Sequence, residues 1–297
     1  MDAVLLHFDD ETQSAQRLAR ACGIDARAIG RHRFPDGELK LTLPASLGAN
    51  VILLRSLDQP NEKLIEVLLA AQGARAAGVR QLTLVAPYLA YMRQDIAFHP
   101  GEVVSQLVIG RFLAGLVDAL VSVDPHLHRV ATLREAVPLE HANVVSAAPV
   151  LADLIEREWP GALLLGPDAE SAQWVRQAAA RHGFDYGVCT KARRGDREVS
   201  VTLPDLAFHG RDVVLLDDMA STGRTLARAA EALRARGAGR IAAAVTHALF
   251  ADDAVAVMRS AGIGPIWSTD CIRHPSNAVA MADALAAAVA ALYHCSP

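Results

Sequence analysis

Residues 212–226 read DVVLLDDMASTGRTL. The apolar run over 212–216 predicts a strand, and the small residues after its two carboxylates predict a loop that leads into a helix over 222–236. Strand and helix in alternation are the unit from which parallel sheets with helical faces are built. This stretch therefore predicts an α/β fold for the part of the chain that contains it.

The loop between strand and helix has the composition of a phosphate site, because a helix N-terminus directs unpaired backbone N–H groups at an anion. Its small residues are Ser221, Thr222, Gly223 and Thr225. Asp217 and Asp218 stand at the strand end, where carboxylates can accept hydrogen bonds from two adjacent sugar hydroxyls. The alternative is an ordinary capped helix, with Ser221 or Thr222 as the cap and Asp218 solvated.

Short apolar runs alternate with longer helical stretches along the whole chain, and the alternation occurs twice. The predicted strands are 3–8, 39–43, 50–55, 81–86 and 119–123, then 162–165, 185–190, 198–203, 212–216 and 240–246. The predicted helices are 61–77 with Asn61 as its cap, 101–116, 171–182, 222–236 and a buried terminal helix within 278–293. We therefore expect two tightly paired α/β domains, 1–147 and 148–297.

The bulk composition narrows the class of protein. A net charge of -4 and a pI near 6.3 argue against a nucleic-acid binder and favour work on small molecules. The four cysteines lack metal spacing, and we expect free thiols at Cys22, Cys189, Cys271 and Cys295. The N-terminus lacks a signal-peptide pattern, and charges interrupt every long apolar run, so we expect a cytoplasmic protein without a membrane span.

Three segments of the first half indicate ligand contacts. The sequence FPDGE predicts a tight turn that exposes Phe34, Asp36 and Glu38, which can stack on a purine and accept hydrogen bonds from it. An ordinary hairpin turn is the alternative. Arg93, Gln94 and Asp95, and further along His126, each follow the end of a predicted strand, where open sheets bind ligands. A buried Arg93–Asp95 salt bridge and a surface or capping role for His126 are the alternatives.

A basic segment of the second half, TKARRGDREV at 190–199, lies between two predicted strands and contains Lys191 and Arg193. A solvated hairpin tip is the alternative reading. A mobile cationic loop that closes over a polyphosphate would stabilise charge on the bridging oxygens and expel water.

These segments together resemble one enzyme family. Residues 212–226 closely resemble the phosphoribosyl pyrophosphate loop shared by type I phosphoribosyltransferases and phosphoribosyl pyrophosphate synthetases. RFPDGELK at 33–40 and APYLAYMRQD at 86–95 resemble the two nucleotide-binding segments of the synthetases. VSVDPH at 121–126 resembles their metal-histidine segment, and TKARRGDREV resembles their catalytic flexible loop. The resemblance extends from Phe34 to the HPSN at 274–277 and covers nearly the whole chain.

The resemblance implies two tandem type I phosphoribosyltransferase-like domains, each a largely parallel sheet flanked by helices. It also implies a ribose-phosphate diphosphokinase, which transfers the diphosphoryl group of Mg-ATP to the 1-hydroxyl of ribose 5-phosphate and releases AMP. The catalytic residues would be Lys191 and Arg193. The ATP-binding residues would be Phe34, Asp36, Glu38, Arg93, Gln94 and Asp95. The ribose 5-phosphate-binding residues would be Asp217, Asp218, Ser221, Thr222, Gly223 and Thr225.

The implied cofactor is Mg²⁺, with His126 and Asp168 as its partners in the protein. The FPDGE loop would reach ATP bound in a neighbouring subunit, which implies a homo-oligomer with a shared ATP site. Three positions depart from the family pattern, of which Ala169 and Glu170 replace the doubled glycine that many synthetases have. Glu170 adds negative charge where the synthetases have glycine, and Arg224 stands at another frequent glycine position. A phosphoribosyltransferase that consumes the same compound and a catalytically silent regulatory paralog are the alternative functions.

Overall fold

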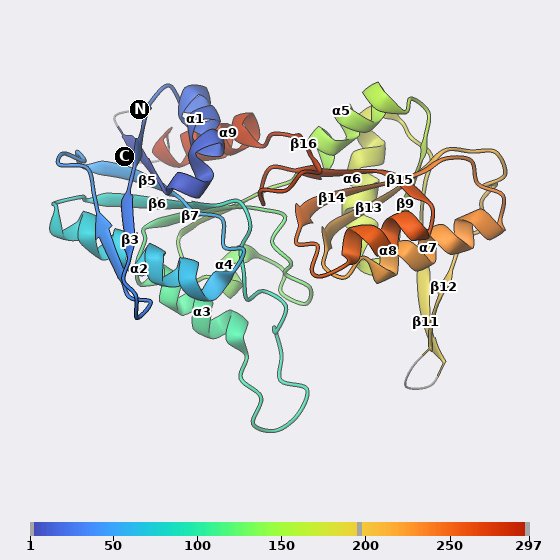
Figure 1. The fold of residues 1–297 in the computed structure, drawn as a ribbon, viewed down its shortest axis with the longest axis horizontal. Coiled ribbons are helices and arrows are strands. Elements are labelled where there is room, and N and C mark those ends of the chain that lie inside the picture. The colour runs from blue at the N-terminus through green and yellow to red at the C-terminus, as the bar shows by residue number, and fades with distance from the viewer. Residues whose placement is uncertain (1–2, 195–197, 295–297) are drawn as a thin grey trace. The chain divides into compact units, whose positions relative to one another are not determined.

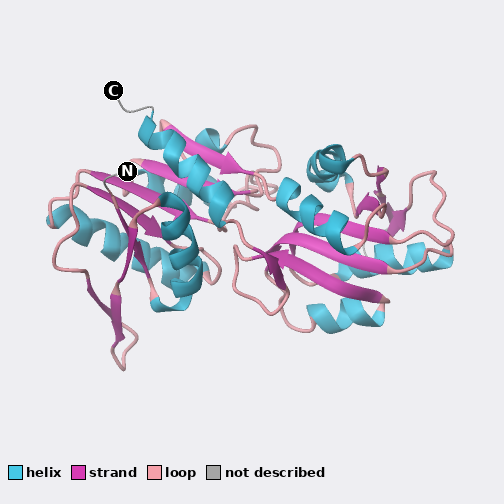
Figure 2. Ribbon diagram, turned by 90° about the horizontal axis from the view of Figure 1, so that it is seen from above, coloured by secondary structure: helices cyan, strands magenta, loops and turns pink. Residues whose placement is uncertain are grey.

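The computed structural model describes residues 3–194 and 198–294, with the side chains of 191–194, 198–200 and 294 left outside the description. It divides into two compact units, 1–145 with 281–297 and 146–280 (Figure 1). Each unit is one six-stranded parallel sheet with helices on both faces (Figure 2). The α/β fold expected from the sequence is confirmed.

In the first unit the sheet has the order β2-β1-β5-β6-β7-β8. Its strands are β1 (Val4–His7), β2 (Asp25–Ala28), β5 (Asn50–Leu54), β6 (Gln81–Ala86), β7 (Ala119–Val123) and β8 (His141–Val145). Its helices are α1 (Thr12–Cys22), α2 (Pro60–Ala76), α3 (Ser105–Ala114), α4 (Leu133–Ala136) and α9 (Ala282–His294). The helices α1 and α9 cover one face and α2 and α3 the other (Figure 1). A hairpin of β3 (Gly30–Arg33) and β4 (Leu39–Thr42) stands outside the sheet.

In the second unit the sheet has the order β10-β9-β13-β14-β15-β16. Its strands are β9 (Leu163–Gly166), β10 (Tyr186–Val188), β13 (Val213–Ala220), β14 (Ile241–Ala248), β15 (Ile263–Thr269) and β16 (Asn277–Val279). Its helices are α5 (Ala148–Glu158), α6 (Ala172–His182), α7 (Arg224–Ala235) and α8 (Ala254–Ser260), of which α5 packs on α6 and α7 on α8. A separate ribbon pairs β11 (Thr190–Arg194) with β12 (Glu198–Thr202).

The two sheets share one topology. If the sheet strands of each unit are counted along the chain, both follow the order second, first, third, fourth, fifth, sixth. The strand order reverses between β1 and β5 in the first unit and between β9 and β13 in the second. Ligands of open parallel sheets bind at the carboxyl ends of the strands beside such a reversal.

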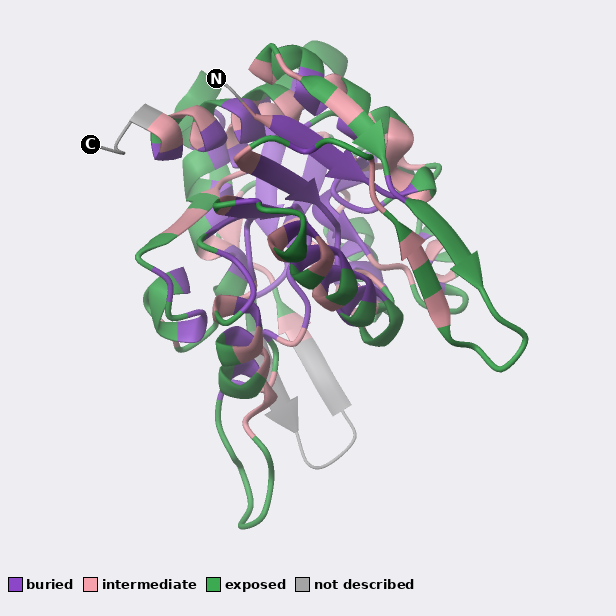
Figure 3. Cartoon of the chain, turned by 90° about the vertical axis from the view of Figure 1, so that its left-hand side faces the viewer, coloured by how far each residue is buried: buried purple, intermediate pink, exposed green. Residues whose placement is uncertain are grey.

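The central strands form the core of each unit, as Figure 3 shows for the first. The strands β6 and β7 have only buried residues after Gln81, which agrees with their nearly continuous apolar sequences. The outward sides of most helices are exposed, as the amphipathic pattern of α1 and α7 requires. No helix in residues 3–194 and 198–294 combines the length and hydrophobicity that a bilayer crossing requires.

Besides sheet strands that were not predicted, the structure differs from the expected elements in the domain bounds, one helix cap and the place of one strand. The terminal helix α9 belongs with the first unit, where it packs on α1, although the expected second domain was 148–297. Helix α2 is capped by Gln59 without a side-chain bond, so Asn61 is not the cap; Pro60, which lacks an N–H, occupies the first turn. The expected strand over 198–203 forms the ribbon rather than the sheet.

The cysteine prediction is confirmed where the structure describes the residues. Cys22, Cys189 and Cys271 are free thiols, and the last two are buried. Burial raises the pKa of the Cys189 thiol to about 12, and the nearby Asp168 carboxylate adds to the effect. Cys295 lies outside the described residues.

Candidate active site

The predicted phosphate loop, residues 217–225, lies at the carboxyl end of β13, beside the reversal in strand order of the second sheet. The strand continues to Ala220, so Asp217 and Asp218 are part of its carboxyl end instead of following it. Phe250 and Ala251 donate backbone hydrogen bonds to Ala220 (2.9 Å) and Ser221 (2.9 Å). These two bonds fix the start of the loop against the segment that follows β14.

Gly223 makes the turn from this loop into α7. Its φ of 68° is left-handed, and a Cβ at this position would lie 2.9 Å from Met258 Cγ and 3.0 Å from the Ala254 carbonyl oxygen. Only glycine therefore fits. Gly223 occupies the N-cap position of α7, so neither Ser221 nor Thr222 stands at the cap as the alternative reading requires. The first turn of α7 can direct its N–H groups at an anion.

Three carboxylates gather beside this loop. Asp217 is partly accessible, Asp218 is 3% exposed, and Asp168 approaches from the turn after β9. Burial raises the pKa of Asp217 well above its usual range, and the neighbouring carboxylates of Asp218 and Asp168 raise it further. The structure thus brings the predicted sugar-binding acids and one predicted metal partner into a single cluster.

The turn after β9 is built around Asp168. Its side chain accepts a hydrogen bond from the Glu170 backbone N–H (3.1 Å), and its carbonyl accepts one from the Ser171 hydroxyl (2.6 Å). Gly166 leaves the room for this turn, because a Cβ there would lie 2.2 Å from Ser171 Oγ. Glu170, the departure from the family pattern, is exposed, and so is Arg224 at the start of α7.

The candidate residues of the first unit lie on two neighbouring loops at the carboxyl ends of β6 and β7. Arg93 is exposed and Gln94 is half-buried on the first loop, and His126 is half-buried on the second, with its ring stacked on His128 at 5.9 Å between centroids. Gln94 donates from its side chain to the Ile96 carbonyl (2.9 Å).

Asp95 connects these two loops. Its side chain is fully buried and accepts hydrogen bonds from the Arg129 guanidinium (2.9 Å) and the Arg129 backbone N–H (3.2 Å), with His128 Nδ1 at 3.3 Å. Burial alone would raise the pKa of Asp95, but the backbone hydrogen bond and the charge of Arg129 hold it below its usual range. Because both carboxylate oxygens are engaged, we interpret Asp95 as a residue that positions the His126 loop. The ion-pair partner of Asp95 is Arg129, whereas the sequence analysis considered Arg93.

Backbone strain marks the same two loops. Tyr91, Asp124 and His128 have left-handed φ values of 63°, 35° and 50°. Non-glycine residues hold such conformations only where their surroundings enforce them, and these conformations cluster at functional sites.

The FPDGE segment forms the tip of the hairpin of β3 and β4, as predicted. Phe34 donates its backbone N–H to the Glu38 carbonyl (2.8 Å), and Gly37 donates to the Phe34 carbonyl (2.9 Å) with a left-handed φ of 96°. The Phe34 ring is 40% exposed, and Asp36 and Glu38 are exposed beside it. The tip therefore presents an aromatic ring and two carboxylates to solvent.

Lys191 and Arg193 lie on β11, opposite Val201 and Val199 of β12. Their segment is thus a two-stranded ribbon and not an open loop between strands of the sheet. Their side chains, and all of residues 195–197, lie outside the described part of the chain.

Two contributors were not among the candidate residues chosen from the sequence. Arg129 is 34 residues from its partner Asp95, and no local pattern joins them. Asn277 donates from its side chain to the Thr269 (2.5 Å) and Ile272 (3.0 Å) carbonyls and accepts from the His274 N–H (2.9 Å). It thereby fixes the loop after β15, at the same edge of the sheet as the acids. Its place in HPSN was the one available hint.

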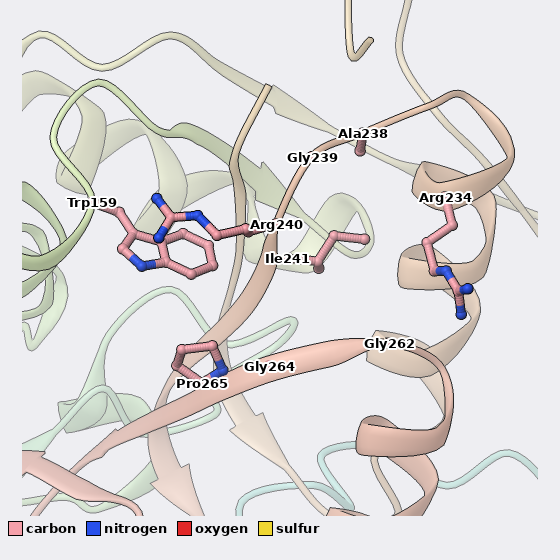
Figure 4. Close-up of a pocket in the computed structure, with 9 residues that line it drawn as sticks. All are labelled: Trp159, Arg234, Ala238, Gly239, Arg240, Ile241, Gly262, Gly264 and Pro265. Atoms are coloured by element: carbon pink, nitrogen blue, oxygen red, sulfur yellow. The ribbon is translucent and has the colours of Figure 1, made fainter. Parts of the chain in front are cut away.

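A cavity of about 360 Å³ lies at the opposite edge of this sheet, at the amino ends of β14 and β15 (Figure 4). Arg240 packs over the Trp159 ring at 4.4 Å and is paired with Asp212 at 2.5 Å. The cavity is lined by Trp159, Arg234, Ala238, Gly239, Arg240, Ile241, Gly262, Gly264 and Pro265. None of the candidate residues lines it, so the chemistry is concentrated at the carboxyl edge.

The shared strand order, with the acids and small residues at the carboxyl end of β13, agrees with an α/β protein of the phosphoribosyltransferase class. Residues 3–115 match the N-terminal domain of ribose phosphate pyrophosphokinase, and residues 146–260 match the phosphoribosyl transferase domain. A ribose-phosphate pyrophosphokinase of Methanopyrus kandleri is 34% identical over 96% of this chain and 98% of its own. One of Thermococcus kodakarensis is 32% identical over 84% of this chain and 85% of its own.

The fold agrees with these matches. The crystal structure of a phosphoribosylpyrophosphate synthetase from Mycobacterium smegmatis superposes with a TM-score of 0.84 and 22% sequence identity, over 99% of this chain and 100% of that chain. The chain belongs to the ribose-phosphate pyrophosphokinase family.

Proposed function

We propose that this chain is a ribose-phosphate diphosphokinase, which transfers the diphosphoryl group of ATP to the 1-hydroxyl of ribose 5-phosphate. The products are phosphoribosyl pyrophosphate and AMP. The observation that carries the proposal is the uncapped N-terminus of α7 beside the cluster of Asp168, Asp217 and Asp218. The N–H groups at the start of α7 suit a phosphate, and the three carboxylates suit sugar hydroxyls or a cation. Family membership over nearly the whole chain favours the diphosphokinase over a phosphoribosyltransferase.

The ribose 5-phosphate would lie on the β13 loop. Its phosphate would accept hydrogen bonds from the first turn of α7 and from the hydroxyl residues around Gly223, which are Ser221, Thr222 and Thr225. Asp217 and Asp218 would accept hydrogen bonds from the ribose hydroxyls. The binding of a hydroxyl or a cation would relieve the repulsion that raises the pKa of Asp217.

ATP would contact Arg93 and Gln94, on the loop that Asp95 holds, and the hairpin tip of a neighbouring subunit. In that tip Phe34 can stack on the purine, and Asp36 and Glu38 can accept hydrogen bonds from the nucleoside. The hairpin stands outside the sheet, and its tip residues are exposed, which suits a contact made in trans. We therefore propose a homo-oligomer.

The proposed cofactor is Mg²⁺ brought with ATP. Within residues 3–194 and 198–294 no group of three His, Cys, Asp or Glu side chains is arranged to hold a metal. The acidic oxygens around Asp168 nevertheless fit a hard cation that keeps most of its waters and binds one or two carboxylates and the phosphates. Asp168 and His126 are the proposed protein partners. When bound, the ion would neutralise part of the phosphate charge.

In the reaction the 1-hydroxyl oxygen of the sugar attacks the β-phosphorus of ATP. The bond from that phosphorus to the oxygen bridging it to the α-phosphorus breaks, AMP leaves, and the hydroxyl proton passes to solvent. Lys191 and Arg193 would stabilise the negative charge that develops on the phosphate oxygens. Alignment of the two substrates supplies much of the remaining rate, and no covalent intermediate on the protein is needed.

The test is an assay for AMP with purified protein, Mg-ATP and ribose 5-phosphate. Wild-type protein should release AMP only when the sugar phosphate is present, and Lys191→Ala should lower kcat by about a hundredfold or more. Arg157→Gln is the matched control, because Arg157 is an exposed cation at the end of α5. Absence of AMP from wild-type protein, or equal rates for wild type and Lys191→Ala, would refute the proposal.

A further inference from the structure

The crevice at the reversal of strand order in the first unit is filled by charged side chains. In the second unit the equivalent position, between β9 and β13, is where the carboxylates and the phosphate loop lie. In the first unit Arg55 follows β5 and is only 1% exposed. Its guanidinium donates to Asp10 (2.8 Å), to Glu11 (2.9 Å) and, over a short contact, to Glu66. This crevice therefore holds an internal ion network.

The Arg55–Glu66 pair at the centre of the network is buried, which makes each of the two depend on the other. Glu66 is 1% exposed, like Arg55, and the Arg55 guanidinium lies 4.6 Å from the centroid of the buried Phe8 ring. Taking such charges out of water costs several kcal/mol per ion unless geometry and hydrogen bonds compensate. Glu11 Oε1 also accepts from the Ser56 backbone N–H at 2.6 Å, so the β1 and β5 ends are joined.

From this network a ladder of ion pairs reaches the FPDGE hairpin. Arg31 on β3 donates to Glu66 at 2.6 Å, and Arg33 donates to Glu62 at 2.7 Å. The two arginines are two positions apart on one face of a strand, and the two glutamates are four apart on one face of α2. Arg31 also donates to Asp9 at 2.6 Å. The base of the hairpin is thus fixed to both α2 and the end of β1.

Apolar packing does not hold β3 in place. All four of its residues are exposed, and β4 contributes only the half-buried Leu39 and Leu41. A polar cavity of about 340 Å³ lies between the hairpin base and α2. It is lined by Asp10, Arg31, Arg33, Arg55, Gln59, Glu62, Lys63 and Glu66. The direction in which the hairpin points therefore depends mainly on the ladder.

We propose that Glu66 is a positioning residue for nucleotide binding, which acts through Arg31 to set the direction of the hairpin that carries Phe34, Asp36 and Glu38. The inference rests on the proposed function, in which that tip contacts ATP. Glu66 itself touches no substrate. Loosening the ladder should weaken ATP binding and leave the ribose 5-phosphate loop of the second unit unaffected.

The first test is Glu66→Gln, which keeps the shape of the side chain and removes its charge. KM for ATP should rise about tenfold, because small misplacement of a binding group costs one to two orders of magnitude. KM for ribose 5-phosphate should stay within about twofold of wild type. Arg75→Gln is the control, since Arg75 lies on the same helix and loses a pair with Asp118 (2.7 Å) that is not part of the ladder. It should change neither KM.

The second test uses the exposed ion pair of Arg33 and Glu62, which can be changed without burying an unpaired charge. Arg33→Glu and Glu62→Arg should each raise KM for ATP about threefold, as expected for an exposed pair turned into a repulsion, and the double reversal should restore it. Dissociation constants for an ATP analogue with a methylene between the α- and β-phosphates should follow the same pattern without turnover.

Two outcomes overturn the proposal. One is a parallel change of both KM values in Glu66→Gln, and the other is a double reversal that fails to recover ATP affinity. Wild-type protein that releases no AMP refutes the proposed function instead. In that case the analogue affinities of the variants still decide whether the ladder positions the hairpin.

Discussion

The contact between Asp95 and Arg129 leads to a specific prediction for the substitution Asp95→Asn. If Asp95 positions the His126 loop, its loss should lower both the stability of the first unit and the efficiency with which ATP is used. If Asp95 instead contacts ATP directly, only ATP use should fall. A measurement of stability therefore distinguishes the two possibilities. The Asp95 side chain is fully buried, whereas the Arg129 side chain is 44% exposed.

The free energy of unfolding that Asp95→Asn should lose follows from this difference in exposure. Arg129 can be hydrated once its partner is neutral, so no buried cation is stranded, and the loss is that of two charge-assisted hydrogen bonds at about 1 kcal/mol each. A loss of about 2 kcal/mol corresponds to a fall in Tm of about 4–8 °C for a unit of this size. Misplacement of His126 should reduce kcat/KM for ATP about tenfold.

The assay is a double-mutant cycle of Asp95→Asn and Arg129→Gln, measured by thermal unfolding and by AMP release. If the acid acts through Arg129, the double variant should lose about 2 kcal/mol, no more than Asp95→Asn alone, because Arg129→Gln keeps the backbone N–H that bonds Asp95. Additive losses, or an Asp95→Asn variant with wild-type Tm and weakened ATP use, would refute the reasoning.

Three further substitutions have outcomes that follow from the structure. Asp217→Asn should raise KM for ribose 5-phosphate yet stabilise the unliganded protein. The raised pKa of the folded carboxyl means that wild-type stability falls as pH rises from the ordinary carboxyl range, so the variant's advantage in Tm should grow as the pH rises above that range; an advantage independent of pH would contradict this. Gly110→Ala should cost about 3 kcal/mol or more in urea unfolding, because the added Cβ would lie 1.7 Å from the Ala136 carbonyl oxygen. Gly73→Ala, whose Cβ would meet only the flexible Leu43 side chain at 3.0 Å, should cost less than about 1 kcal/mol, and equal losses for the two would count against the packing argument.

The strands that the sequence predicted to the residue are those buried on both faces. The bounds of β6 and β7 agree with the apolar runs because each has a nearly continuous buried sequence. The strands β2 and β8 were missed because they are sheet edges in which no residue is buried. β15 was missed because Pro265 and a register shift interrupt its pattern.

The candidate site also has a part that could be predicted from the sequence and a part that could not. The acids and small residues of the β13 loop are contiguous in sequence, so their chemistry could be predicted before their geometry. The positioning contacts could not, because Asp95 with Arg129 and Arg31 with Glu66 join residues 34 and 35 positions apart. Such pairs depend on which loops the sheet order brings together, and no local periodicity encodes that order.

The central claim is that the β-phosphorus of ATP moves to the sugar together with the γ-phosphoryl group. The most direct measurement follows ATP labelled at the β-phosphorus, incubated with the protein, Mg²⁺ and ribose 5-phosphate. The proposed function predicts that the label appears in phosphoribosyl pyrophosphate and that the AMP released is unlabelled. Label recovered in ADP or in free pyrophosphate would contradict it.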